Sequence, residues 1–187
     1  SITLTGAPTG GPTFVSGTIN TDTYWTVLSS PYIVTASVLV ASGTTLTIDP
    51  GVEVQFNPAC CLTVEGVLIA TGMPSNYIVF TASSSNPSPG YWNKIWFKST
   101  SDSTKCKIGY AKISYGQYGI YADQASPEIY GCEISSNSNS GIYLYCNNKA
   151  VYITSCSVSC HYSDWGIFLY YPNGGLITGC TIYNNSY

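Results

Sequence analysis

The chain has 187 residues and a formal net charge of −3, and only 8% of its residues are charged, none of them arginine. Such a scarcity of basic side chains argues against a nucleic-acid-binding protein, which needs clustered Lys and Arg. The length suits one domain with a sizeable core, and no apolar run approaches the ~20 residues that a membrane-spanning helix needs.

The first 23 residues, SITLTGAPTGGPTFVSGTINTDT, are rich in Gly, Thr and Pro. They contain two short apolar stretches, one around Ile2 and Leu4 and one around Phe14. We predict that residues 1–23 form an irregular segment and that residues 24–187 form the main fold. The segment is expected either to cap the first coil of its own molecule or to donate a strand to a neighbouring subunit.

One short strand pattern recurs in the second half of the chain. It is found in KIWFKS (94–99), GIYADQ (119–124), GIYLYC (141–146) and GIFLYY (166–171), and GVEVQF (51–56) reads as an earlier copy. Apolar and polar residues alternate in it, so that Ile95, Ile120, Ile142 and Ile167 share one inward column. Alternation with a period of two is typical of a strand with one buried face.

A second pattern lies between these strands. It is found in CKIGYAKISYG (106–116), PEIYGCEISSN (127–137), VYITSCSVSCH (151–161) and GLITGCTIYNN (175–185), and the last three copies are 24 residues apart. No stretch keeps the periodicity of a helix. Short strands that recur at a nearly fixed step predict an all-β fold, a β-solenoid of about six coils in which each coil packs on the next.

The phrases VLVASGTTLTIDPGVEVQF, LTVEGVLIATG, IVFTA and YWNKIWF resemble the opening of right-handed parallel β-helix domains of secreted and cell-surface proteins. The later ISSNSNSGIYL is similar to the short repeats of the pectate-lyase-like superfamily. The resemblance covers about residues 24 to 187 and implies a single-stranded right-handed parallel β-helix. It implies no single function, because this architecture hosts lyases, hydrolases, epimerases, adhesins and spacers.

Large aromatic residues recur on the outward face of the first strand pattern. One column contains Trp96, Tyr121, Tyr143 and Phe168, and the next outward column contains Tyr145 and Tyr170. Stacked coils must align these side chains in a strip along the rod. We interpret the strip as an assembly or binding surface, since contiguous apolar patches mark partner sites. Two alternatives stay open: a loop or the N-terminal segment covers the rings, or the rings bind sugars.

The eight cysteines favour an oxidising, extracellular setting. Adjacent coils bring Cα atoms to ~4.8 Å, within the range of a disulfide, and we expect the vicinal pair Cys60–Cys61 to reach Cys106. The column of Cys132, Cys156 and Cys180 is either cross-linked or a ladder of small apolar core groups. The disulfide candidates are therefore Cys60, Cys61, Cys106, Cys132, Cys156 and Cys180. No C-x-x-C motif occurs, and no metal or cofactor is predicted.

No catalytic residue is predicted. Glu53 and Asp123 are expected on equivalent strands about two coils apart, too far for the ~5 Å of a retaining glycosidase pair. Glu128 and Glu133 are five residues apart in one coil, and we interpret all four as surface charges.

The only histidine, His161, falls in a turn column with Asn137 and Asn185. A lone histidine in a turn is usually a surface residue that makes hydrogen bonds, and we predict that role here.

The sequence starts at Ser1 and its only methionine is Met73, which suggests a processed, secreted protein. Residues 177–187 read as a regular strand and turn of the repeat, so we expect an open β-edge at this end. The residues predicted to stack at the two ends are Ile2, Leu4, Phe14, Ile177, Cys180 and Ile182.

The resulting hypothesis is a non-enzymatic extracellular or cell-surface protein that assembles with itself, head to tail, into a filament. The first alternative is a carbohydrate-binding or polysaccharide-degrading β-helix protein, with glycans as partners. The second alternative is an adhesin or spacer segment of a larger surface protein.

Overall fold

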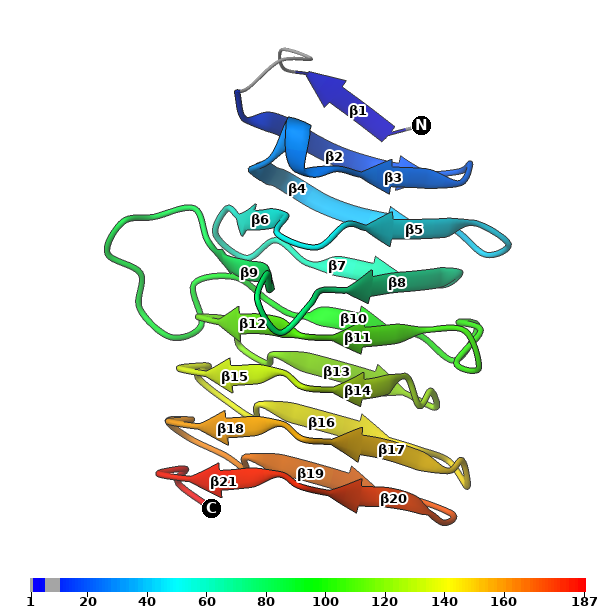
Figure 1. The fold of residues 1–187 in the computed structure, drawn as a ribbon, viewed down its shortest axis with the longest axis vertical. Coiled ribbons are helices and arrows are strands. Elements are labelled where there is room, and N and C mark those ends of the chain that lie inside the picture. The colour runs from blue at the N-terminus through cyan, green and yellow to red at the C-terminus, as the bar shows by residue number, and fades with distance from the viewer. Residues whose placement is uncertain (1, 6–10) are drawn as a thin grey trace.

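The computed structural model describes residues 2–5 and 11–187, which form a rod of stacked β-coils (Figure 1). One seven-stranded parallel sheet contributes one strand to each coil, so the described chain makes seven coils. The predicted all-β parallel β-helix is confirmed. The number of coils exceeds the expected six because β2 and β3 form a first coil ahead of β4.

Each coil from β7 onward contains three strands, which stack into three parallel columns of strands along the rod. The first column contains β7 (Leu62–Val64), β10 (Ile95–Phe97), β13 (Ile120–Asp123), β16 (Ile142–Tyr145) and β19 (Ile167–Tyr170). The second contains β3 (Thr23–Trp25), β5 (Thr45–Ile48), β8 (Val67–Thr71), β11 (Lys107–Gly109), β14 (Glu128–Tyr130), β17 (Val151–Thr154) and β20 (Gly175–Thr178). The third contains β6 (Glu53–Phe56), β9 (Ile78–Ala82), β12 (Ala111–Ser114), β15 (Glu133–Ser135), β18 (Ser157–Ser159) and β21 (Thr181–Tyr183).

The long strand β4 (Tyr32–Val40) joins the first and third columns into one 14-stranded sheet. Its first half pairs with β6 and its second half pairs with β7. The segment GVEVQF, expected to be a copy of the first-column strand, instead forms β6 in the third column. That prediction was wrong because the strands of all three columns share the same period of two.

The N-terminal segment is part of the rod. The strand β2 (Thr13–Ile19) pairs in parallel with β4 and buries Val15 and Ile19, and β1 (Ile2–Thr5) pairs with β2 in antiparallel fashion. A short 3-10 turn, η1 (Val27–Ser29), connects β3 to β4. The side chains of Ile2 and Leu4 lie outside what the structure describes.

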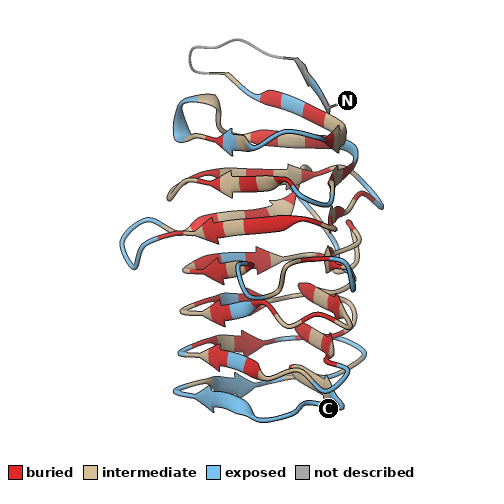
Figure 2. Ribbon diagram, turned by 90° about the vertical axis from the view of Figure 1, so that its right-hand side faces the viewer, coloured by how far each residue is buried: buried red, intermediate tan, exposed pale blue. Residues whose placement is uncertain are grey.

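The interior of the rod is a continuous apolar core, visible as the buried bands in Figure 2. Each inward column passes from coil to coil in register; Ile95, for example, stacks between Leu62 and Ile120. Wider coils contain aromatic rings, and Trp92 stacks on Phe56 at 4.2 Å between ring centroids. Because every strand buries alternate side chains between two neighbours, hydrophobic burial stabilises each coil through the next.

A sharp bend separates the second strand of a coil from the third. The bend residue has positive φ in four successive coils, at Tyr110, Gly131, Ser155 and Gly179. The next residue in each coil faces the core, and in three of these coils it is a cysteine. The bend therefore sets the direction of the Cys132, Cys156 and Cys180 side chains.

Among the described residues, no helix has the length and apolar character needed to cross a membrane.

Candidate binding surfaces

The outward aromatic residues form a continuous ladder on the first column of strands. Strand register places Trp96, Tyr121, Tyr143 and Phe168 directly above one another, and we call these four residues the aromatic ladder. Tyr121 and Tyr143 are stacked at 4.9 Å with an angle of 1° between ring planes, and Tyr143 and Phe168 are stacked at 4.8 Å and 18°.

This stacking directs the ring faces of Tyr121, Tyr143 and Phe168 along the rod, whereas Trp96 meets Tyr121 edge to face at 6.3 Å and 87°. Only the ring edges and the tyrosine hydroxyls then face outward. Burial raises the pKa of the Tyr121 and Tyr143 phenols. A sugar stacks on an aromatic face, so the inner rungs of the ladder offer little to a sugar.

Lysines cover the N-terminal end of the ladder. The Nζ of Lys98 lies 3.8 Å from the centre of the Trp96 ring, and the Nζ of Lys94 lies 4.3 Å from that of Tyr121. Burial lowers the pKa of Lys94. These cation–π contacts occupy the ring surface of Trp96 that the ladder leaves uncovered.

The two rings of the second outward column are tilted and farther apart than the stacked rings of the ladder. Tyr145 and Tyr170 are in register, with ring centroids 5.4 Å apart and planes tilted by 53°. Tyr170 also contacts Phe168 and Tyr171, which joins the two columns into one aromatic surface near the last coil. The structure thus brings together all six residues that the sequence assigned to this strip.

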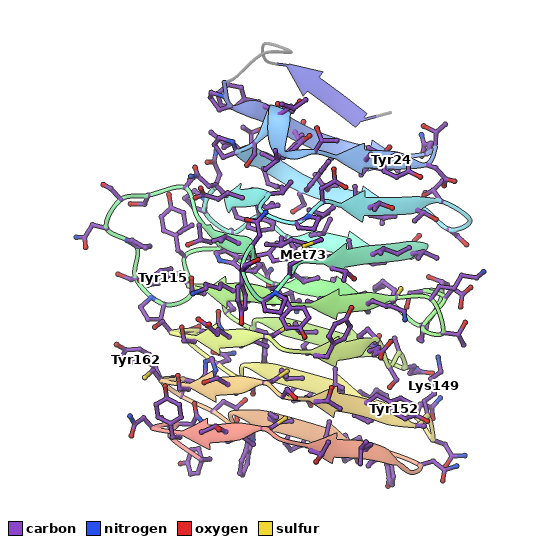
Figure 3. All side chains as sticks on the ribbon, viewed as in Figure 1. Tyr24, Met73, Tyr115, Lys149, Tyr152 and Tyr162 are labelled. Carbon is purple, nitrogen blue, oxygen red and sulfur yellow. The ribbon has the colours of Figure 1, made fainter. Side chains whose placement is uncertain are left out.

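A groove lies on another side of the rod, where the turns between the first and second strands of three coils meet. It has a volume of about 770 Å³ and is lined by Ser101, Asp102, Ser103, Thr104, Ser126, Glu128, Lys149, Ala150 and Tyr152. Figure 3 shows Lys149 and Tyr152 together at this edge. Sequence reasoning missed this groove because its residues come from three turns and the strands β14 and β17, with no shared motif.

One residue of the groove, Tyr152, suits a ligand with a flat apolar side. The Ser101 side chain is only 6% exposed, and its hydroxyl has no hydrogen-bond partner among the described residues. Tyr152 is 50% exposed, and no aromatic ring within the described part of the chain stacks on it. A ligand in the groove could therefore contact the exposed Tyr152 ring, whereas the unpaired Ser101 hydroxyl is buried beneath the groove surface.

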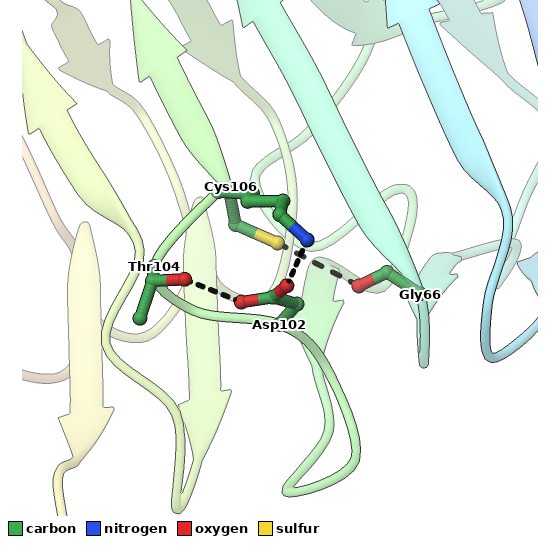
Figure 4. Close-up of polar contacts among 5 residues, drawn as sticks. Gly66, Asp102, Thr104 and Cys106 are labelled. Atoms are coloured by element: carbon green, nitrogen blue, oxygen red, sulfur yellow. Dashed lines mark hydrogen bonds and ion pairs between the residues drawn. The ribbon is translucent and has the colours of Figure 1, made fainter.

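The carboxylates in the groove form ion pairs with lysines. Asp102 accepts hydrogen bonds from Thr104 Oγ1 at 2.6 Å and from Lys105 Nζ at 2.8 Å (Figure 4), and these contacts lower its pKa. Glu128 is paired with Lys107 at 3.0 Å, from one coil to the next. On the third column Glu133 is paired with Lys112 in the same way at 2.9 Å.

Glu53 and Asp123, expected on equivalent strands, lie in different columns, on β6 and β13. Across residues 2–5 and 11–187, no three His, Cys, Asp or Glu side chains gather as metal ligands would.

All eight cysteines are thiols in the structure. Cys106 lies beside Gly66 at the far end of β7, with its Sγ 3.7 Å from the Gly66 carbonyl oxygen, whereas Cys60 precedes β7 (Figure 4). Cys61 faces outward, toward the hydroxyls of Ser37 and Thr63. The structure therefore does not bring the vicinal pair to Cys106, because β7 separates them.

The other three candidate disulfide cysteines are stacked in one column. Cys132, Cys156 and Cys180 occupy the same position in three successive coils. Cys132 and Cys156 are buried, and Cys180 is partly exposed.

His161 is buried, which corrects the prediction of a surface residue. It is 2% exposed, and its Nδ1 accepts a hydrogen bond from the backbone N–H of Asn137 at 3.3 Å. The same pattern recurs in this column: the N–H of Gly116 donates to Asn137 Oδ1 at 2.7 Å, and that of His161 donates to Asn185 Oδ1 at 3.2 Å. The column is a ladder in which the imidazole replaces one asparagine amide.

The last coil continues the inward columns. Ile177, Cys180 and Ile182 are in register with the buried Ile153, Cys156 and Val158. Figure 2 shows this coil as mostly exposed. Phe14, also expected to stack at an end, instead points outward on β2, in register with Ile33 of β4.

The stacked strands and continuous core define a parallel β-solenoid protein. Residues 93–187, just over half of the chain, match the family model described as a right-handed β-helix region. The chain therefore belongs to the right-handed β-helix family.

A stretch of 55 residues is 42% identical to Protein bark beetle of Drosophila melanogaster. This stretch is 29% of the chain and only 2% of that protein. No solved structure matches the chain.

Proposed function

We propose that this β-helix is a non-catalytic structural protein that works outside the cell and assembles head to tail with copies of itself. The observation that carries the proposal is the register of the inward apolar columns, which continues unchanged into the last described coil. Ile177, Cys180 and Ile182 present there the same apolar columns that are buried one coil earlier. A further coil in register would bury these side chains as the preceding coils bury theirs.

The two edges of the seven-stranded sheet support a second copy as the occupant. One edge is β20 and the other is β3, and both strands run in the same direction in one parallel sheet. Translation of one molecule along the rod would place the β3 edge of one copy on the β20 edge of the next. Contacts of this head-to-tail type extend into filaments unless they close into a ring.

The surface chemistry is consistent with a structural role. Glu128 and Glu133, which could have served a catalytic pair, each form an ion pair with the lysine of the neighbouring coil. Three residues of the aromatic ladder, Tyr121, Tyr143 and Phe168, likewise direct their ring faces from coil to coil. Both arrangements stabilise the stacking of coils along the rod.

Assembly can be tested with two substitutions on one strand. Ile177 faces the inward column and is 45% exposed, and its neighbour Leu176 faces outward and is 52% exposed. Sedimentation velocity and electron microscopy of the unmodified chain should show rods that lengthen with concentration. Ile177→Lys should abolish them, because a charge would be buried between coils, and Leu176→Lys should not. An unmodified chain that stays monomeric at high concentration, or equal effects of the two substitutions, would reject the proposal.

A second candidate function is glycan binding in the groove, favoured by the exposed ring of Tyr152 among its polar lining residues. The probe is an array of neutral and acidic oligosaccharides, followed by calorimetry on any sugar retained. Tyr152→Ala should weaken such binding by roughly tenfold, given the usual energy of one aromatic contact. Tyr162→Ala removes an exposed tyrosine outside the groove and is the control. Absence of binding to the array would exclude this function.

A further inference from the structure

The Cys132, Cys156 and Cys180 side chains repeat one conformation in three successive coils. Each follows a bend residue with positive φ. Each Sγ also lies near the carbonyl oxygen two residues earlier, at 3.3 Å for Cys132, 3.4 Å for Cys156 and 3.5 Å for Cys180. The strands that follow these cysteines are in register from coil to coil, so the three side chains are stacked along the rod.

The spacing along this column suits sulfur chemistry. Neighbouring coils are separated by about 4.8 Å, which lies within the Cα distances that a disulfide spans. The Cys156 thiol has the Cys132 and Cys180 thiols as its neighbours in the column, one coil away on either side. These neighbours lower the pKa of Cys156 to about 7, while burial raises the pKa of Cys132 and of Cys180.

We propose that Cys132, Cys156 and Cys180 form a thiol–disulfide exchange site, in which one disulfide between neighbouring coils forms and moves along the column. Exchange requires a thiolate to approach a disulfide along the axis of its S–S bond. The stacked column provides that approach, because each outer cysteine lies beyond a bond between Cys156 and the other outer cysteine.

The reaction starts with an oxidant of the low-molecular-weight disulfide class. The thiolate of the partly exposed Cys180 attacks one sulfur of the oxidant, forms a mixed disulfide and releases one thiolate. The thiolate of Cys156 then attacks the Cys180 sulfur, forms the protein disulfide and releases the second thiolate. The two released thiolates take up the two protons lost by Cys156 and Cys180. Two protein thiols are oxidised by two electrons, and the oxidant is reduced to two thiols.

The migration step involves no net redox change. The thiolate of Cys132 attacks the Cys156 sulfur, a Cys132–Cys156 bond forms, and the Cys156–Cys180 bond breaks. The released Cys180 thiolate takes up the proton that Cys132 lost. The exchange site does not depend on the proposed head-to-tail assembly, although a further coil stacked over Cys180 would close the route of the oxidant.

The test uses the full chain oxidised with glutathione disulfide, quenched in acid and mapped by mass spectrometry of its peptides. We expect two cross-links in one sample, Cys132–Cys156 and Cys156–Cys180. Cys132→Ala should retain the Cys156–Cys180 link, and Cys180→Ala, oxidised in the same way at higher oxidant concentration, should retain the Cys132–Cys156 link. Cys156→Ala should abolish both and should not produce a Cys132–Cys180 link, since those residues are about 10 Å apart across two coils.

Alanine is a suitable replacement because Ala111 already occupies this column one coil earlier. Circular dichroism confirms that each variant retains its β-structure. Absence of any cross-link within the column, or a Cys132–Cys180 link in the Cys156→Ala variant, would overturn the proposal. A single cross-link in the unmodified chain, unchanged by further incubation, would also overturn it by excluding exchange.

Discussion

The Nδ1 atom of His161 accepts a hydrogen bond from the backbone N–H of Asn137, one coil away. It thereby takes the acceptor position that the Asn137 amide oxygen fills for the N–H of Gly116. This bond requires Nδ1 to be unprotonated, which assigns the ring proton of the neutral imidazole to Nε2. Nε2 itself is buried and has no partner among the described residues. A second proton on this imidazole would break the Asn137 bond and place an uncompensated charge in the turn column.

Acid should therefore weaken the fold through His161. Burial lowers the pKa of His161 from 6.5 to about 4, so between these values the unfolded chain binds a proton that the folded chain does not. The free energy of unfolding should be highest above pH 6.5, should fall as the pH drops toward 4, and should lose about 3 kcal/mol in all from this group. Urea unfolding at a series of pH values measures the change.

His161→Asn separates this effect from the titration of carboxylates. An asparagine at this position would restore an unbroken ladder from Asn137 to Asn185, because its amide oxygen can replace Nδ1. The variant should fold at neutral pH and should lose most of the decline in stability between pH 6.5 and 4. An equal decline in both proteins would show that His161 is not its source.

The sequence allowed the core columns to be predicted, because the alternation of Ile, Val and Cys at a fixed step follows directly from strand geometry. The order of the aromatic ladder followed from the same register. The orientation of its rings did not, since side-chain torsions rather than strand register decide whether Tyr121 faces Tyr143 or the solvent.

Other features depended on contacts between distant residues. The burial of His161 depends on Gly141, which leaves room for the ring, and nothing near His161 in the sequence indicates this. The first coil was missed because β2 carries a bulge between Val15 and Gly17, which disturbs its alternation. The strand GVEVQF was assigned to the wrong column because a period of two does not distinguish the three columns.

The absence of a side chain at Gly141 is needed for the turn column to close. A Cβ added there would meet His161 Nε2 and would lie 2.6 Å from Val158 Cγ1. Gly141→Ala should therefore destabilise the fold by about 1–3 kcal/mol, the usual cost of overpacking a well-packed core. Gly11→Ala is the control, because no heavy atom of the described residues lies within 4 Å of the Cβ that it would add. Denaturant midpoints that fall equally for both variants would contradict this account.

Tyr143 is the residue of the aromatic ladder with a stacked ring on both sides, Tyr121 and Phe168. Tyr143→Ala removes both contacts, each worth about 0.5–1.5 kcal/mol beyond the area that it buries. We expect the free energy of unfolding to fall by about 1–3 kcal/mol, measured by urea titration. Tyr24→Ala removes an exposed tyrosine on β3 and should change stability little. If the ladder acts only as a contact surface for partners and adds nothing to the stacking of coils, the two variants should unfold at the same urea concentration.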